Sequence, residues 1–269
     1  MRQRAKPAPH HRRNSRPPRH GGFRDGAQRG GADAPVILYG WHTVTAALGN
    51  AARSIRRVLA TENAARRLAE EGIDTQRFAL EVVRPHALDA LLTPDAVHQG
   101  LYAEADPLPS PDLADLASGG ILLVLDQITD PHNVGAILRT AAAFAVAAVV
   151  TTARHSPEAT GVLAKSASGA LELVPIISVQ NLARALATLK ERGFLIVGLD
   201  STADVDLSAV PLEAPLALVL GAEGKGLRQG TRAACQYLAR LDLPGAIKSL
   251  NVSNAAALSL YIASRGLGQ

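Results

Sequence analysis

The chain has 269 residues, of which 47% are hydrophobic and 19% charged, a composition typical of a globular protein with one or two cores. Its single cysteine, Cys235, excludes an internal disulfide, and there is no apolar run of about 18 or more residues to span a bilayer. Because the start of the chain has no apolar signal core either, we expect a cytoplasmic protein that crosses no membrane.

The excess positive charge of the chain lies in its first 34 residues. This segment holds nine Lys and Arg side chains against two Asp, a net charge of +7, whereas the remaining 19 basic and 22 acidic side chains give −3. The segment is rich in Arg, Pro, Gly and His, so residues 1–34 are predicted to be a disordered basic tail. Such a tail binds nucleic acid through counterion release, although a purely solubilising tail has the same composition.

Residues 35–106 have the pattern of a small α/β domain. Short apolar runs alternate with helical stretches, the runs at 58–60, 78–83 and 101–103 and the helical stretches at 43–48 and 63–71. The segment 107–119, which is rich in Pro and Gly, is typical of a linker.

From residue 120 to residue 269, apolar strands and helices alternate. The apolar runs are largely continuous, as in strands buried on both faces of a parallel sheet, and lie at 121–125, 147–151, 173–179, 194–198, 216–220 and 238–241. Helices are predicted at 134–144, 157–166, 181–192 and 254–264. This order predicts an α/β domain with helices on both faces of the sheet, whose ligands bind at the carboxyl ends of the strands.

A burst of polar residues follows the first of these strands, in the stretch LDQITDPHNVGAILRT at 125–140. Asp130 and Asn133 are natural caps for the helix that starts there. Capping leaves Arg139 unexplained, because it lies in a helix that is otherwise apolar enough to be buried. We therefore expect Arg139 to be paired or to face a site.

Two more unusual loops follow later strands. Gly221-Ala-Glu-Gly-Lys-Gly226 comes directly after the strand at 216–220, and its glycines permit a close approach of the backbone to a ligand. Its spacing is neither the dinucleotide fingerprint nor a phosphate-binding loop, and a tight turn explains it equally well. Ser249-Leu-Asn-Val-Ser-Asn254 leads into the last helix, where Ser and Asn are most often caps.

Taken together, these loops resemble the SpoU branch of the SPOUT RNA ribose methyltransferases. The matching segments are 125–140 (LDQITDPHNVGAILRT), 165–171 (KSASGAL), 218–227 (LVLGAEGKGL) and 241–254 (LDLPGAIKSLNVSN). The front segments 38–48 (LYGWHTVTAAL) and 98–102 (HQGLY) resemble a substrate-binding domain related to ribosomal protein L30e. That domain precedes the catalytic domain in the 23S ribosomal RNA guanosine-2′-O-methyltransferases of this family.

The resemblance implies a trefoil-knotted α/β methyltransferase domain after an L30e-like domain, with S-adenosyl-L-methionine as cofactor, ribosomal RNA as partner and no metal. It also implies a homodimer with active sites near the subunit interface. The positions that match cofactor contacts are Gly221, Leu243 and Leu250. Those that match catalytic residues are Asn133, Arg139, Glu223, Asn251 and Ser253. The loop at 243–250 is shorter than in many members of the family.

The chemistry of such a reaction is consistent with these residue types. Methyl transfer from a sulfonium to a ribose 2′-hydroxyl is an in-line displacement, in which orientation contributes roughly 7 to 11 kcal/mol. The guanidinium of Arg139 offers five donors in a fixed fork, so we expect it to position the oxygen or the neighbouring phosphate. Glu223 is expected to accept a proton or to orient Arg139.

Other classes of function remain open. A transfer-RNA 2′-O-methyltransferase fits the same motifs, and a catalytically silent RNA-binding factor would need only the front domain and the tail. A nucleotide-dependent enzyme of the doubly wound class is disfavoured because no G-x-G-x-x-G follows the first strand.

Overall fold

In the computed structural model the described residues are Met1, 34–117, 119–154 and 161–268, and residues 34–269 form one compact unit. Almost all of the predicted tail, and the first part of the helix predicted at 157–166, lie outside the described residues. The unit contains two sheets, one of four strands and one of seven.

The four-stranded sheet has the order β1-β4-β2-β3. Its strands are β1 (Val36–Tyr39), β2 (Ile55–Ala60), β3 (Leu80–Val82) and β4 (Leu101–Ala105), and the helices are α1 (Trp41–Gly49), α2 (Glu62–Glu70) and α3 (Pro85–Asp89). Strand β4 is antiparallel to both β1 and β2, whereas β2 and β3 are parallel. The sheet and helices bury Val44 and Leu68 completely, so this small module has an apolar interior.

The seven-stranded sheet has the order β7-β6-β5-β10-β8-β11-β9, and all its neighbouring strands are parallel. The strands are β5 (Ile121–Asp126), β6 (Ala148–Thr152), β7 (Ile176–Val179), β8 (Leu195–Leu199), β9 (Val205–Asp206), β10 (Leu216–Gly221) and β11 (Tyr237–Arg240). The helices are α4 (Pro131–Ala143), α5 (Gly161–Ala167), α6 (Leu182–Glu191), α7 (Gln229–Ala234) and α8 (Val252–Gly266). Three 3-10 turns lie at η1 (Leu113–Asp115), η2 (Ala170–Glu172) and η3 (Leu207–Ala209). The predicted α/β class with a parallel sheet is confirmed.

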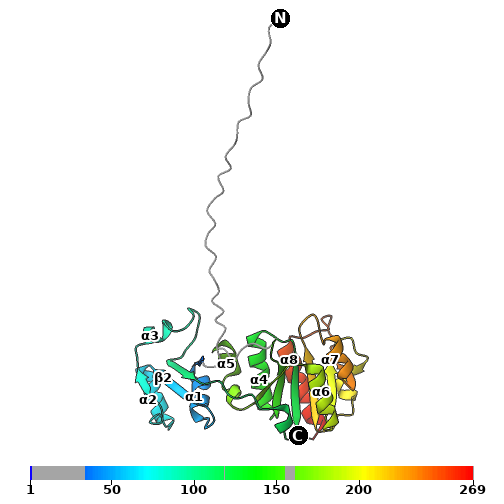
Figure 1. Cartoon of the computed structure of the whole chain (residues 1–269), viewed down its shortest axis with the longest axis horizontal. Helices are drawn as coiled ribbons and strands as arrows, with labels where there is room; N and C mark the ends of the chain where they lie inside the picture. The colour runs from blue at the N-terminus through cyan, green and yellow to red at the C-terminus, as the bar shows by residue number, and fades with distance from the viewer. Residues whose placement is uncertain (2–33, 118, 155–160, 269) are drawn as a thin grey trace. The chain divides into compact units, whose positions relative to one another are not determined.

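The continuous apolar runs are explained by helices that cover both faces of this sheet (Figure 1). In β5, Leu123 packs in the same core cluster as residues of α4 and α8, whereas Leu122 packs in the cluster that contains residues of α6. Successive side chains of a strand point to opposite faces, so both sets must be apolar when both faces are covered.

One predicted strand begins too early. Strand β7 starts at Ile176 and not at residue 173, because the chain first forms the 3-10 turn η2. Leu173 after this turn has a helical conformation and is 73% exposed, so its apolar character does not mark a buried strand. The short helix α7 and the two-residue strand β9 were not predicted.

The order of the strands places a site at one edge of the sheet. Strand β5 lies between β6 and β10, so the chain builds the sheet outward on one side of β5 and then on the other. Ligands of open parallel sheets bind at the carboxyl ends of the strands beside such a reversal. None of the helices in the described part of the chain is long and apolar enough to cross a membrane.

A buried ion pair joins the two sheet regions. Arg53, which precedes β2, donates to Glu172 of η2, and each side chain is only 3% exposed. Asn50 Nδ2 donates to Glu172 Oε2 at 2.7 Å, and Arg53 Nη1 donates to the carbonyl oxygen of Asp106 at 2.8 Å. Because a buried charge without a partner is costly, this network ties the small module to the region around η2.

Candidate functional site

Three loops at the carboxyl edge of the seven-stranded sheet are joined by one carboxylate. Glu223 follows β10, and its Oε1 accepts hydrogen bonds from Asn251 Nδ2 at 2.8 Å, the Val252 backbone nitrogen at 3.2 Å and Asn133 Nδ2 at 3.4 Å. The amide nitrogen of Asn251 also donates to Asn133 Oδ1 at 3.0 Å. The structure thus brings together three of the five predicted catalytic residues. Glu223 Oε2 accepts no hydrogen bond from any residue in the described ranges, so it remains available to a ligand.

Ser253 acts on this cluster through Asn251. Asn251 caps helix α8, and its Oδ1 accepts hydrogen bonds from the Ser253 backbone nitrogen at 2.9 Å and from Ser253 Oγ at 2.6 Å. With its oxygen held in this way, the Asn251 amide must point its nitrogen toward Glu223 and Asn133. Ser253 is therefore placed to position Asn251.

Helix α4 begins beside the same cluster. Asp130 is its N-cap and accepts a hydrogen bond from the His132 backbone nitrogen at 3.0 Å, as one of the two predicted caps. His132 Nδ1 lies 3.2 Å from Ser166 Oγ, so the imidazole contacts α5. Asn133, one residue further on, turns its side chain to Glu223 and Asn251.

The glycine loop is folded back on itself. A Cβ added to Gly221 would lie 2.2 Å from the carbonyl carbon of Gly226, and the Gly226 nitrogen donates to the Ala222 oxygen at 2.8 Å. Gly224 and Gly226 have φ values of +73° and +64°, which residues with a side chain rarely adopt. The glycines are therefore needed by the tight turn itself, which holds Glu223 at its outer edge.

A fully buried carboxylate anchors the end of this loop. Asp126 is the last residue of β5, and its two oxygens accept from the Arg228 backbone nitrogen at 2.9 Å and from Arg228 Nε at 2.6 Å. Sequence reasoning missed this contact, although an acidic residue at the end of an otherwise apolar strand was a signal that it is paired.

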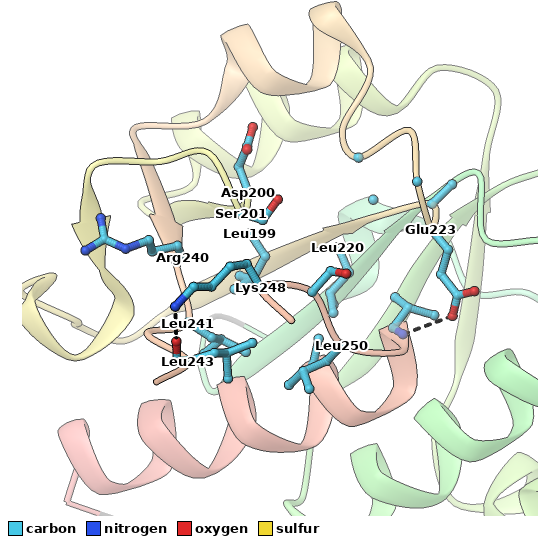
Figure 2. Close-up of a pocket in the computed structure, with 17 residues that line it drawn as sticks. Leu199, Asp200, Ser201, Leu220, Glu223, Arg240, Leu241, Leu243, Lys248 and Leu250 are labelled. Carbon is cyan, nitrogen blue, oxygen red and sulfur yellow. Dashed lines mark hydrogen bonds between the residues drawn. The ribbon is translucent and has the colours of Figure 1, made fainter. Parts of the chain in front are cut away.

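One cavity of about 370 Å³ lies between the glycine loop and the segment that leads to α8 (Figure 2). All three predicted cofactor residues line it, and five of its lining residues are leucines. The lining residues are Leu199, Asp200, Ser201, Leu220, Gly221, Ala222, Glu223, Gly224, Gly226, Arg240, Leu241, Leu243, Lys248, Ser249, Leu250, Val252 and Ala255. In Figure 2, Glu223 and Arg240 lie on opposite sides of this cavity. The cavity therefore offers a ligand both apolar side chains and charged groups.

Charged residues also line this first cavity, among them Asp200, Arg240 and Lys248. Partial burial raises the pKa of Asp200, but hydrogen bonds from Thr202 and the positive charge of Arg232 outweigh it, so the pKa lies below its ordinary value. Lys248 Nζ donates to the carbonyl oxygen of Leu243 at 2.6 Å, and this bond links two residues that both line the cavity (Figure 2). Neither Asp200 nor Lys248 was predicted as a site residue.

A second cavity, of about 350 Å³, lies on the other side of Glu223. It is lined by the loop after β5, the start of α4 and part of the glycine loop, namely Gln127, Ile128, Thr129, Asp130, Asn133, Ala222, Glu223, Lys225 and Val252. Ala222, Glu223 and Val252 line both cavities. Glu223 therefore stands in a wall that two ligands would share.

Arg139 does not join this cluster. It lies on α4 but is exposed, lines neither cavity, and its side chain makes no hydrogen bond or ion pair with another residue in the described ranges. Within a single chain, the described residues therefore give Arg139 neither a partner nor a place at either cavity, and its role stays a prediction. Residues Asn133 and Arg139 are six positions apart, which places them on different faces of a helix of 3.6 residues per turn.

Lys165 connects the two sheet regions. Its Nζ donates to Gln99 Oε1 at 2.9 Å, and the same oxygen accepts from the Trp41 backbone nitrogen at 3.0 Å. Burial lowers the pKa of Lys165. Three of the segments that carried the family resemblance, at 38–48, 98–102 and 165–171, thus meet at one amide oxygen.

Comparison with protein families matches both parts of the chain. Residues 120–261 match the SpoU rRNA Methylase family, and residues 37–111 match the family described as RNA 2′-O ribose methyltransferase substrate binding. The first match covers more than half of the chain and contains all three loops of the site.

Curated relatives extend over most of the chain. It is 39% identical over 236 residues to the 23S rRNA (guanosine-2′-O-)-methyltransferase RlmB of Ralstonia nicotianae, covering 85% of this chain and 95% of that protein. It is 40% identical over 240 residues to RlmB of Xylella fastidiosa, with the same coverage of 85% and 95%. The solved structure of the SpoU methyltransferase AviRb from Streptomyces viridochromogenes, in complex with AdoMet, has the same fold. It gives a TM-score of 0.74 at 23% identity and covers 86% of this chain and 90% of that chain. The chain therefore belongs to the SpoU rRNA methylase family.

Proposed function

We propose that this chain transfers a methyl group from S-adenosylmethionine to the ribose 2′-hydroxyl of a guanosine in 23S ribosomal RNA. The observation that carries the proposal is the carboxylate of Glu223, which is held by Asn251, Val252 and Asn133 in the wall between two cavities. The family and the names of the relatives with 39% and 40% identity support this substrate and reaction. A ribosomal RNA substrate also favours the cytoplasmic location expected from the sequence.

The first cavity fits the cofactor. Its leucines offer an apolar slot for an adenine, the folded glycine loop presents backbone groups, and the charged residues Asp200, Arg240 and Lys248 suit the polar ends of the molecule. Gly221, Leu243 and Leu250 would hold the cofactor there. When bound, the cofactor supplies an electrophilic methyl group on a sulfonium.

The protein's own groups prepare the acceptor. We assign to Glu223 Oε2 the hydrogen bond from the ribose 2′-hydroxyl, so that this carboxylate would take the proton of the hydroxyl when its oxygen is methylated. Asn133 and Asn251 keep the carboxylate in place, and Ser253 keeps Asn251 in place. Most of the rate enhancement then comes from holding the oxygen in line with the methyl group.

Arg139 enters the proposal through a second copy of the chain. Helices α4 and α8 pack side by side, and exposed side chains project from both, with Leu258 at 43% and Tyr261 at 55% exposure on α8. We infer a homodimer through these helices that buries this apolar surface and brings Arg139 to the active site of the partner. There its guanidinium would stabilise the charge on the acceptor oxygen or bind the adjacent phosphate.

The finer features of the fold belong to the same proposal. We infer a trefoil knot in which the C-terminal segment threads a loop, an L30e-like module at residues 35–106 that binds RNA, a linker at 107–119 and a catalytic domain at 120–269. The family match at residues 120–261 supports the knot. The family match at residues 37–111 supports the RNA-binding module.

The test uses the purified full chain with a tritium-labelled methyl donor and 23S ribosomal RNA from cells that lack the gene. We expect label in that RNA at a single guanosine, mapped as a block to primer extension at low nucleotide concentration. Transfer RNA from the same cells is the matched control. Label in transfer RNA alone, label on a base, or no transfer to either RNA contradicts the proposal.

A further inference from the structure

The second cavity carries polar side chains that the catalytic cluster does not use. Gln127 and Lys225 line it from two different loops, one after β5 and one the glycine loop. Neither side chain makes a hydrogen bond or an ion pair with another residue in the described ranges of the chain. An ammonium and an amide that face a cavity without a protein partner are available to a ligand there.

The backbone of Gln127 supports a functional role for this wall. Its φ is +60°, in the left-handed region that residues other than glycine rarely occupy. The residue before it, Asp126, is fully buried and bonded to Arg228, so Gln127 cannot relax without disturbing the anchor of the glycine loop. Side chains held in such a conformation concentrate at binding sites.

We propose that the second cavity receives the guanine base of the target nucleotide, with Lys225 and Gln127 as the residues that select guanine. This inference rests on the proposed function, because it places the acceptor ribose at the shared wall of Glu223. The volume of about 350 Å³ accepts one nucleoside and no duplex, so the nucleotide enters unpaired and turned out of its stack.

The chemistry of the two side chains selects guanine over adenine. Guanine presents two acceptors, O6 and N7, on one edge, and a lysine ammonium that donates to both is a common specific contact. Adenine places an amino group at the position of O6, and an ammonium has no acceptor to offer it. The Gln127 amide has both an acceptor and donors, so its oxygen can accept from guanine N1–H or the 2-amino group.

The test compares selectivity and not activity alone. The guanosine that the wild-type protein methylates is mapped first. Transcripts of 23S RNA with either guanosine or adenosine at that position are then assayed with Lys225→Met, Gln127→Gly and Lys190→Met. Lys190 is exposed on α6 and lines neither cavity, so it is the matched control. Gln127→Gly also removes the backbone strain, so a loss of selectivity in this variant does not come from misfolding.

We expect wild type and Lys190→Met to prefer guanosine in kcat/KM. Lys225→Met should lose about tenfold or more on guanosine and little on adenosine, with an unchanged Kd for S-adenosylmethionine by calorimetry. Equal losses on both transcripts, or no change on either, overturn the assignment of Lys225 to the base. A wild-type protein that methylates guanosine and adenosine equally overturns guanine selection as well. A wild type that methylates no ribose contradicts the proposed function itself, and this inference with it.

Discussion

Asn251 Nδ2 donates to Glu223 Oε1 at 2.8 Å, and this bond joins two loops that are 28 residues apart in the sequence. The same nitrogen reaches Asn133 Oδ1 at 3.0 Å, so a single amide ties all three loops of the site together. The arrangement leaves one carboxylate oxygen of Glu223 for a ligand. The position of that oxygen is fixed before any substrate arrives, which is the arrangement that preorganised catalysis requires.

Glu223→Gln should therefore separate chemistry from structure. Glutamine keeps the shape and one acceptor oxygen for Asn251 and Val252, but it has no negative charge to receive a proton. We expect kcat to fall by about 10²-fold or more, with a melting temperature close to that of wild type. Single-turnover methylation and thermal unfolding measure the two effects. A variant with wild-type kcat would assign Glu223 to loop structure alone.

Arg139→Ala should abolish methyl transfer while the affinity for S-adenosylmethionine stays within about twofold of wild type, since Arg139 lines neither cavity. Arg139→Lys should also be poor, because a point charge does not replace the guanidinium fork. Arg184→Ala, a change of an exposed arginine on α6, is the matched control.

The dimer offers a sharper form of this experiment. If Arg139 acts on the partner's site, mixing Arg139→Ala with Glu223→Gln should restore part of the activity, because one site in the mixed dimer has both groups intact. Mixed dimers that stay inactive would place Arg139 and Glu223 in the same site of one chain.

Gly221→Ala should abolish binding of S-adenosylmethionine. A methyl group at this position lies 2.2 Å from the Gly226 carbonyl carbon, so the glycine loop has to open and the cavity wall moves. The sequence left open whether the glycines serve a ligand or a tight turn, and the structure shows that a side chain at Gly221 would meet the loop's own backbone. Gly230→Ala is the control, because its added Cβ has no neighbour closer than 3.9 Å. Calorimetry with both variants checks the prediction, and an unchanged affinity for Gly221→Ala would contradict it.

The sequence predicted the large sheet well because its strands are buried on both faces. A run such as 216–220 is apolar at every position only when helices cover both sides, so the pattern itself carries the parallel topology. Leu173 shows the limit of this signal. An exposed leucine in a 3-10 turn looks the same in the sequence as a buried one, and only the packing of the neighbouring elements distinguishes them.

The sequence could predict those site residues that directly follow a strand or belong to a motif after one. Asn133, Glu223 and Asn251 each follow a strand of one parallel sheet, so their convergence follows from topology. Asp200 and Arg240 also line the first cavity, but no sequence motif marks them. Their place in the site depends on which strands become neighbours in the sheet. The exposure of Arg139 depends on its angle around α4, which a list of apolar neighbours does not determine. The roles of all these residues in catalysis stay predictions.

Arg53→Met should destabilise the protein by about 3 to 5 kcal/mol, because Glu172 would be left buried without its charged partner. Replacing both residues with apolar ones, as in Arg53→Met with Glu172→Leu, should recover much of that loss. The control is Arg66→Met, whose ion pair with Glu70 is two-thirds exposed and should contribute less than about 1 kcal/mol. Urea unfolding of the three variants gives the free energies. Equal effects of Arg53→Met and Arg66→Met would contradict the prediction.

Deletion of residues 1–34 should weaken binding to RNA without changing which nucleotide is methylated. The segment has a net charge of +7, whereas the rest of the chain has a net charge of −3, so the segment can contact phosphates. Its only aromatic residue is Phe23, so it has few side chains on which bases could stack. The affinity of full-length and truncated protein for 23S RNA is measured across a salt series. We expect a shallower slope of log affinity against log salt for the truncated protein, and convergence of the two curves at high salt, because fewer counterions are released. The methylated nucleotide is then mapped for each protein. An unchanged salt slope contradicts a role of the tail in binding phosphates, and a shift of the methylated position would show that the tail contributes to the choice of nucleotide.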